Sequence, residues 1–151
     1  AIAWYRANRF YGLELFPDAR AVLEQLRRGP DPFAVRPLGI ITNGPADVQR
    51  DKVDLLRIRR LVNFVIISGE FGASKPDPAI YAAALKHAGV AAEETVFVGD
   101  SVEHDMAGAH ASGLRSVWIS RHETPWAGPG RAPDRQIRHI GELPILVGSG
   151  G

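Results

Sequence analysis

The sequence predicts an α/β protein whose parallel sheet is covered by helices on both faces. Four continuous apolar, β-branched runs, at residues 38–42, 63–67, 95–98 and 116–120, are typical of strands that are buried on both faces. Stretches with helical periodicity separate these runs, and that alternation favours a parallel sheet. In such sheets, ligands bind beyond the carboxyl ends of the strands.

The first half of the chain contains two of these strands and two predicted helices. The first helix begins near Asp18, and its apolar side chains recur at i, i+3, i+4 and i+7 over residues 19–26. The strand at 38–42 ends in a Thr-Asn-Gly-Pro turn. A charged helix follows over residues 46–57, with an expected inner side of Val48, Leu55 and Leu56.

The second half of the chain again alternates strands and helices, and here the residues that begin and end the helices are easier to recognise. Asp77 is expected to cap a helix that begins at Pro78 and runs to about residue 88. Ser101 is expected to cap the helix after the third strand, and Gly113 to end it. A loop rich in proline and glycine contains Trp126, which either rims a substrate pocket or packs the loop down. A weak strand and a short helix complete the chain over residues 136–147.

Composition limits the class of protein. The 151 residues are enough for one domain, and 45% apolar and 23% charged residues are typical of a globular protein. A net charge of +1 gives no support to nucleic-acid binding. The absence of cysteine excludes disulfides, thiolate metal sites and a cysteine nucleophile. No apolar run is long enough for a membrane span, and the first residues lack a signal-peptide pattern, so we expect a cytoplasmic protein.

Two carboxylates follow the third strand. Asp100 lies directly at its carboxyl end, and Asp105 lies about one turn into the next helix. Two carboxylates at one edge of a sheet offer the hard oxygen ligands that suit a hard cation, so the pattern predicts a Mg²⁺ site formed by Asp100 and Asp105. The alternative is that both carboxylates only stabilise the start of the helix, where negative charge is favourable.

Two further features are expected at the same edge. The turn of Thr42, Asn43 and Gly44 offers a hydroxyl and backbone N–H groups at a helix start, which can hold phosphate oxygens. Lys75 offers a positive charge for a phosphoryl group. Together with a metal held by carboxylates, these are the parts that phosphoryl transfer needs. His104 lies near the two carboxylates, but a solvent-facing position is the more ordinary expectation for it.

These motifs, in this order, resemble the haloacid dehalogenase-like hydrolase superfamily over residues 16–120. Thr42 matches the second motif of that family, Lys75 the third, and Asp100 and Asp105 the fourth. The resemblance implies a Rossmann-like three-layer α/β/α core and Mg²⁺-dependent phosphohydrolysis through an aspartyl-phosphate. It further implies catalytic roles for Thr42, Lys75 and Asp100, with a phosphate bound by Lys75 and residues 42–44. Weaker similarity points to the branch that acts on nucleotides and sugar phosphates.

One motif of the family is missing. Its first motif, Asp-x-Asp-x-Thr after an N-terminal strand, carries the nucleophile, and no Asp-x-Asp occurs in these 151 residues. Residues 1–15 resemble the end of a cap insert, and residues 16–151 the core domain. We therefore expect a chain truncated before the nucleophile and weakly active or inactive by itself. The alternatives are a non-catalytic module that binds phosphate or metal, and a short form that uses metal-activated water.

The resemblance has a consequence for the sheet. The missing strand would lie between the strands at 38–42 and 95–98, so two half-sheets would face each other with unpaired edges. We expect these strands either to close up and pair directly or to be joined through a strand-swapped homodimer. We expect no nucleic acid and no membrane among the partners, and a small phosphorylated metabolite as the substrate.

Overall fold

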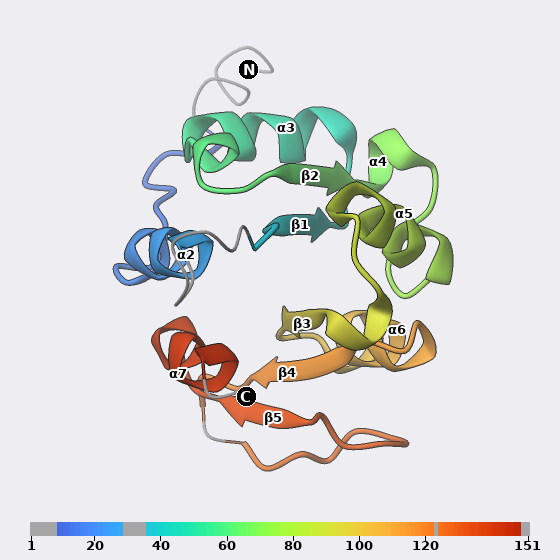
Figure 1. The fold of residues 1–151 in the computed structure, drawn as a ribbon. Coiled ribbons are helices and arrows are strands. Elements are labelled where there is room, and N and C mark those ends of the chain that lie inside the picture. The colour runs from blue at the N-terminus through green and yellow to red at the C-terminus, as the bar shows by residue number, and fades with distance from the viewer. Residues whose placement is uncertain (1–8, 29–35, 123, 149–151) are drawn as a thin grey trace.

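The computed structural model describes residues 9–28, 36–122 and 124–148 (Figure 1). Part of the expected cap remnant at residues 1–15 therefore lies outside the described residues. The order of elements alternates strands with helices, as the sequence predicted. The helices are α2 (Ala19–Arg28), α3 (Ala46–Leu55), α4 (Ser68–Phe71), α5 (Pro78–Ala88), α6 (Ala107–Ala111) and α7 (Leu143–Gly148). The strands are β1 (Gly39–Thr42), β2 (Phe64–Ile67), β3 (Val96–Gly99), β4 (Arg115–Ile119) and β5 (Arg135–Ile137).

The expected ends of the helices are confirmed. Asp77 accepts a hydrogen bond from Ala79 N at 2.9 Å at the start of α5. Ser101 accepts one from His104 N at 3.1 Å and begins a single π turn, Val102–Met106, which leads into α6. Gly113 follows α6 with a φ of +74°, which a residue with a side chain rarely adopts.

The expected inner side of α3 is wrong at one position. Leu55 is 62% exposed, whereas Val53 is the buried residue of the helix. Two residues along a helix correspond to a rotation of roughly 200°, so a helix that buries Val53 turns Leu55 toward solvent. Leu56 and Val48 are half-buried.

The strands form two parallel sheets, and not the single closed sheet that was one expectation. Within the described residues, β1 pairs with β2, and the second sheet has the order β3-β4-β5. No ladder joins β1 to β3, so the prediction that these strands pair directly is wrong for this structure. The strand-swapped dimer stays a prediction.

Two helical layers cover the sheets. On one face, α2 and α7 pack on β4 and β5 in a core that contains Val22, Val117 and Leu143. On the other face, α5 and α6 pack on β2 in a core that contains Ile80 and Tyr81, both completely buried. This is the three-layer α/β/α arrangement, with its sheet in two parts. None of the described helices is long and apolar enough to cross a bilayer.

A polar cluster fixes the long loop after β4 to the start of that strand. His110 Nε2 lies 2.8 Å from the buried hydroxyl of Ser116, whose backbone N–H donates to Asp134 at 2.8 Å. Burial lowers the pKa of His110, and the charge of Arg131 lowers it further, while Asp134 acts in the opposite direction. The folded protein therefore favours the neutral imidazole.

We expect the free energy of unfolding to fall on mild acidification because of His110. The unfolded imidazole has a pKa of about 6.5, and the folded one is lower. The contribution of the neutral imidazole is complete above the unfolded pKa and is lost as the pH falls through the folded pKa. Urea unfolding at pH 7.5 and 5.5 measures this loss. The His110→Gln variant should lose less stability over the same interval, and an equal loss in both proteins would contradict the assignment.

Candidate functional site at the carboxyl ends of β1 and β3

The structure brings Lys75 and Asp105 together. Lys75 Nζ lies 2.6 Å from Asp105 Oδ1, and this ion pair is well shielded, since the two side chains are 13% and 5% exposed. Lys75 lies in the loop before α5 and Asp105 in the π turn after β3, so the pair joins the two halves of the fold. A buried ion pair is retained only where both charges are well partnered.

The second oxygen of Asp105 holds the turn after β3. Asp105 Oδ2 accepts hydrogen bonds from the backbone N–H groups of Asp100 and Ser101, at 3.1 and 3.0 Å. Gly99 makes this approach possible, because a Cβ at that position would lie 2.4 Å from the Asp105 carboxyl carbon. The side chain of Asp105 therefore organises the turn, and both of its oxygens have protein partners.

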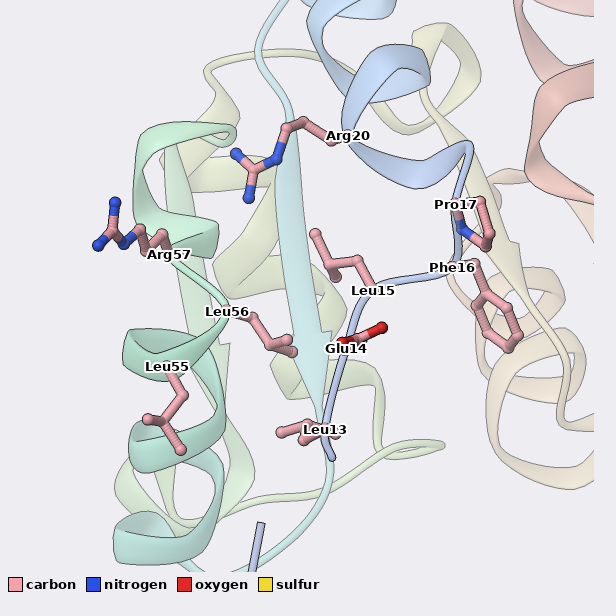
Figure 2. A pocket seen from close by; sticks show the side chains of 9 residues that line it. All are labelled: Leu13, Glu14, Leu15, Phe16, Pro17, Arg20, Leu55, Leu56 and Arg57. Carbon is pink, nitrogen blue, oxygen red and sulfur yellow. The ribbon is translucent and has the colours of Figure 1, made fainter. Parts of the chain in front are cut away.

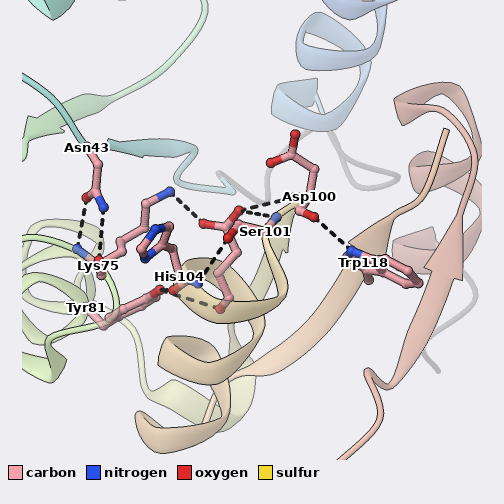
Figure 3. Close-up of polar contacts among 8 residues, drawn as sticks. Asn43, Lys75, Tyr81, Asp100, Ser101, His104 and Trp118 are labelled. Atoms are coloured by element: carbon pink, nitrogen blue, oxygen red, sulfur yellow. Dashed lines mark hydrogen bonds and ion pairs between the residues drawn. The ribbon is translucent and has the colours of Figure 1, made fainter. Parts of the chain in front are cut away.

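Asp100 differs from Asp105 in exposure and in partners. Its side chain is exposed, and within the described part of the chain no hydrogen bond or ion pair engages its carboxylate. Figure 3 shows this carboxylate outside the network of polar contacts. The backbone of Asp100 is held on both sides, since Trp118 Nε1 donates to its carbonyl at 2.9 Å. Of the two aspartates, Asp100 is thus the one whose carboxylate has no partner among the described residues.

Trp126 packs the loop down and does not extend the polar site. Its ring meets Trp118 edge to face, with centroids 5.2 Å apart at 84°. The packing interpretation of Trp126 is therefore confirmed. Through Trp118, the loop after β4 supports the backbone of Asp100.

Two of the three residues of the Thr42–Gly44 turn hold neighbouring loops. The side chain of Asn43 bonds both the N–H and the carbonyl of Lys75, each at 2.9 Å (Figure 3). The N–H of Gly44 donates to Ser68 Oγ at 2.9 Å. Asn43 and Gly44 therefore fix the two loops that carry the site. Among the described residues, no partner of the Thr42 hydroxyl is found, and this group is available to a ligand.

Tyr81 supports the helix side of the site. Its hydroxyl donates to the His104 carbonyl at 2.7 Å, and its ring lies against Gly108, where a Cβ would clash with it. Burial, and then the charge of Asp105, raise the pKa of Tyr81, so the phenol stays a neutral donor. The His104 ring is exposed, as expected for a solvent-facing helix residue.

A pocket of about 500 Å³ lies elsewhere, between the chain before α2 and the end of α3. Figure 2 shows leucines from both segments around it. Its lining residues are Leu13, Glu14, Leu15, Phe16, Pro17, Arg20, Leu55, Leu56 and Arg57. The pocket is not part of the predicted site, because it is lined by none of the six predicted site residues, which are Thr42, Asn43, Gly44, Lys75, Asp100 and Asp105.

Comparison with known proteins identifies the family. The fold and the order of Thr42, Lys75 and the two aspartates define a Rossmann-like α/β hydrolase core. Residues 3–113 match the sequence model of the haloacid dehalogenase-like hydrolases. The chain belongs to this family.

Individual relatives include both phosphatases and dehalogenases. The chain is 37% identical to a phosphoserine phosphatase of Thermus thermophilus, over 95% of this chain and 54% of the relative. It is 33% identical to a glyceraldehyde 3-phosphate phosphatase of Methanopyrus kandleri, over 95% and 56%. A solved 2-haloacid dehalogenase of Pseudomonas syringae has a TM-score of 0.75 at 34% identity, over 88% and 53%. The chain thus spans about half the length of the relatives it matches.

Proposed function

We propose that this chain carries the phosphate and metal site of a Mg²⁺-dependent phosphohydrolase that acts on a small phosphorylated metabolite, such as a nucleotide or a sugar phosphate. One observation carries the proposal. The Lys75 ammonium is held by Asp105 at 2.6 Å at the edge where the exposed Asp100 carboxylate also lies. A fixed cation beside a free carboxylate can receive a phosphate together with a metal ion.

Asp100 is the residue that could hold a metal ion, although no group of three or more acidic or histidine side chains with metal-binding geometry is found among the described residues. Its carboxylate supplies a hard oxygen ligand, has no described protein partner, and stands on a backbone held by Asp105 and Trp118. Bound Mg²⁺ would neutralise phosphate charge. Asp105 was the second predicted ligand of the metal ion. Both of its oxygens have protein partners, so in this proposal Asp105 instead orients the turn that carries Asp100 and holds Lys75.

Thr42 and Lys75 are the groups that contact the phosphate in this proposal. The Thr42 hydroxyl donates to a phosphate oxygen, and the Lys75 ammonium offsets its charge. Asn43 keeps Lys75 in place through its two backbone hydrogen bonds. The phosphatases among the relatives, at 37% and 33% identity, support this class of reaction.

The chain by itself is proposed to bind phosphate with little turnover. Covalent catalysis needs a nucleophile. Within the described part of the chain, the aspartate that pairs with Lys75 is Asp105, and both of its oxygens are engaged. The alternative of a binding module without catalysis predicts the same phosphate site. A short form that hydrolyses phosphate through activated water predicts turnover that disappears with EDTA.

Phosphate-induced chemical-shift changes in a ¹⁵N-labelled sample test the site. We expect the changes to cluster at Thr42, Asn43, Gly44 and Lys75, because this turn and this lysine carry the available donors. Sodium chloride at equal ionic strength is the control for general screening. Shifts scattered over the basic surface would mean non-specific attraction and would contradict the proposed site.

A further inference from the structure

The two peptide groups that flank the Cα atom of Asp100 are held by side chains from other parts of the fold (Figure 3). Asp105 Oδ2 accepts from the N–H groups of Asp100 and Ser101, so one oxygen serves both peptides. Trp118 Nε1 donates to the Asp100 carbonyl at 2.9 Å, and this bond does not depend on Asp105. Peptide groups are planar, so fixing both planes fixes the direction of the Cα–Cβ bond of Asp100. Its exposed carboxylate then keeps only its side-chain torsions.

The position of Trp118 in β4 directs its indole at this turn. Trp118 is the register partner of Gly99, the residue before Asp100, and it is 8% exposed. Side chains alternate between the faces of a sheet, so Trp118 lies on the opposite face from Val117, which belongs to the core under α2 and α7. A buried indole N–H needs an acceptor, and the Asp100 carbonyl provides one.

The loop after β4 packs on both Trp118 and the turn. The Trp126 ring meets the Trp118 ring edge to face. A Cβ at Gly128 would lie 2.5 Å from Val102 Cγ1 and 2.7 Å from the Trp126 ring, so the loop passes close to Val102. Trp126 Nε1 is buried, but it has no hydrogen-bond partner in the described part of the chain. Of the two facing indoles, the one that bonds the turn is therefore that of Trp118.

We infer that Trp118 is a positioning residue for the Asp100 carboxylate, and that its indole N–H raises the affinity of Asp100 for a divalent cation. This role rests on the metal site of the proposed function and adds the residue that prepares it. A carboxylate whose direction is fixed before binding loses less conformational freedom when a metal ion binds. Trp126 supports Trp118 by packing, and its N–H takes no part.

A matched pair of substitutions separates the hydrogen bond from the packing. Trp118→Phe keeps an aromatic ring beside the loop but removes the N–H that holds Asp100. Trp126→Phe makes the same change in the facing ring, whose N–H has no described partner. Isothermal titration calorimetry should show Mg²⁺ binding weakened by about threefold or more in Trp118→Phe, as the loss of one hydrogen bond predicts, and unchanged in Trp126→Phe. Metal-free phosphate binding, which is proposed for Thr42 and Lys75, should be unchanged in both variants.

A measurement without metal tests the positioning itself. The Ser101 amide belongs to the peptide group whose carbonyl Trp118 bonds. ¹⁵N relaxation should give this amide the order parameter of rigid backbone, about 0.85, in the wild type and in Trp126→Phe. A lower order parameter is expected in Trp118→Phe, and an unchanged value there would overturn the positioning role.

The Mg²⁺ titrations distinguish failure of this role from failure of the metal site. Equal Mg²⁺ affinity in wild type and Trp118→Phe, or an equal loss in both variants, would overturn the role of Trp118 and leave the metal site in place. No binding by the wild type would overturn the metal site, and the role of Trp118 with it. If Trp118→Phe does not fold, the wild-type indole signals decide. The Trp118 N–H signal should shift with Mg²⁺ more than that of Trp126, and the absence of this difference would overturn the inference.

Discussion

Replacement of Asp105 with alanine is expected to lower the free energy of unfolding by about 3–5 kcal/mol, the usual loss when one partner of a buried ion pair is removed. Asp105 is 4% exposed, and it partners the Lys75 ammonium and two backbone N–H groups. The variant would leave these donors without an acceptor in a shielded place. Urea unfolding followed by circular dichroism measures the difference.

Asp100→Ala is the matched control for that experiment. The two carboxylates belong to one motif, but Asp100 is exposed and its side chain has no described partner. Its removal is expected to change the free energy of unfolding by no more than about 0.5 kcal/mol. Equal losses in the two variants would contradict the different roles assigned to these aspartates.

The second large effect concerns Mg²⁺ binding. Asp100→Asn is expected to weaken Mg²⁺ binding by about tenfold or more, because an amide replaces the free carboxylate while the backbone stays in place. Isothermal titration calorimetry measures the affinity, and the unchanged unfolding transition shows that the variant is folded. Glu103 lies three residues after Asp100 and is also exposed. The Glu103→Gln variant therefore controls for the loss of one negative charge near the site. Equal Mg²⁺ affinity in wild type and Asp100→Asn would remove the metal site.

Much of the fold could be predicted from the sequence because its signals are local. The strands at residues 38–42 and 63–67 are continuous apolar runs, and their structural counterparts each begin one residue later. The caps at Asp77 and Ser101 depend only on short-range hydrogen bonds. These features need no knowledge of distant contacts.

The distribution of roles within the site could not be predicted in this way. That Asp105 bonds Lys75, 30 residues earlier, follows from the way in which the two halves pack. The same is true of Asn43, whose amide holds the Lys75 backbone, and of the Trp118 indole, which holds Asp100. Sequence patterns showed which residues meet at one edge, but not which of their atoms remain free. The Gly before Asp100 was a usable signal, since it marks the close approach of Asp105.

The expected closure of β1 onto β3 failed for a related reason. The unpaired backbone N–H and C=O groups of two free strand edges are costly, and this cost favours direct pairing of the edges. The cores under α2 with α7, and under α5 with α6, instead hold both half-sheets through residues such as Val98 and Ile41. Direct pairing would require these helical layers to move together, and a sequence pattern does not contain that constraint.

The coupling between phosphate and Mg²⁺ tests most directly whether Thr42, Lys75 and Asp100 form one site. Two ligands that share a site must change each other's affinity by the same factor. Titration of the wild-type protein with phosphate, with and without saturating Mg²⁺, should show phosphate binding tightened by about fivefold or more by the metal. Asp100→Asn should lose this coupling while it keeps the weaker metal-free phosphate binding. A phosphate affinity that is the same with and without Mg²⁺, or a coupling that persists in Asp100→Asn, would contradict a joint phosphate and metal site.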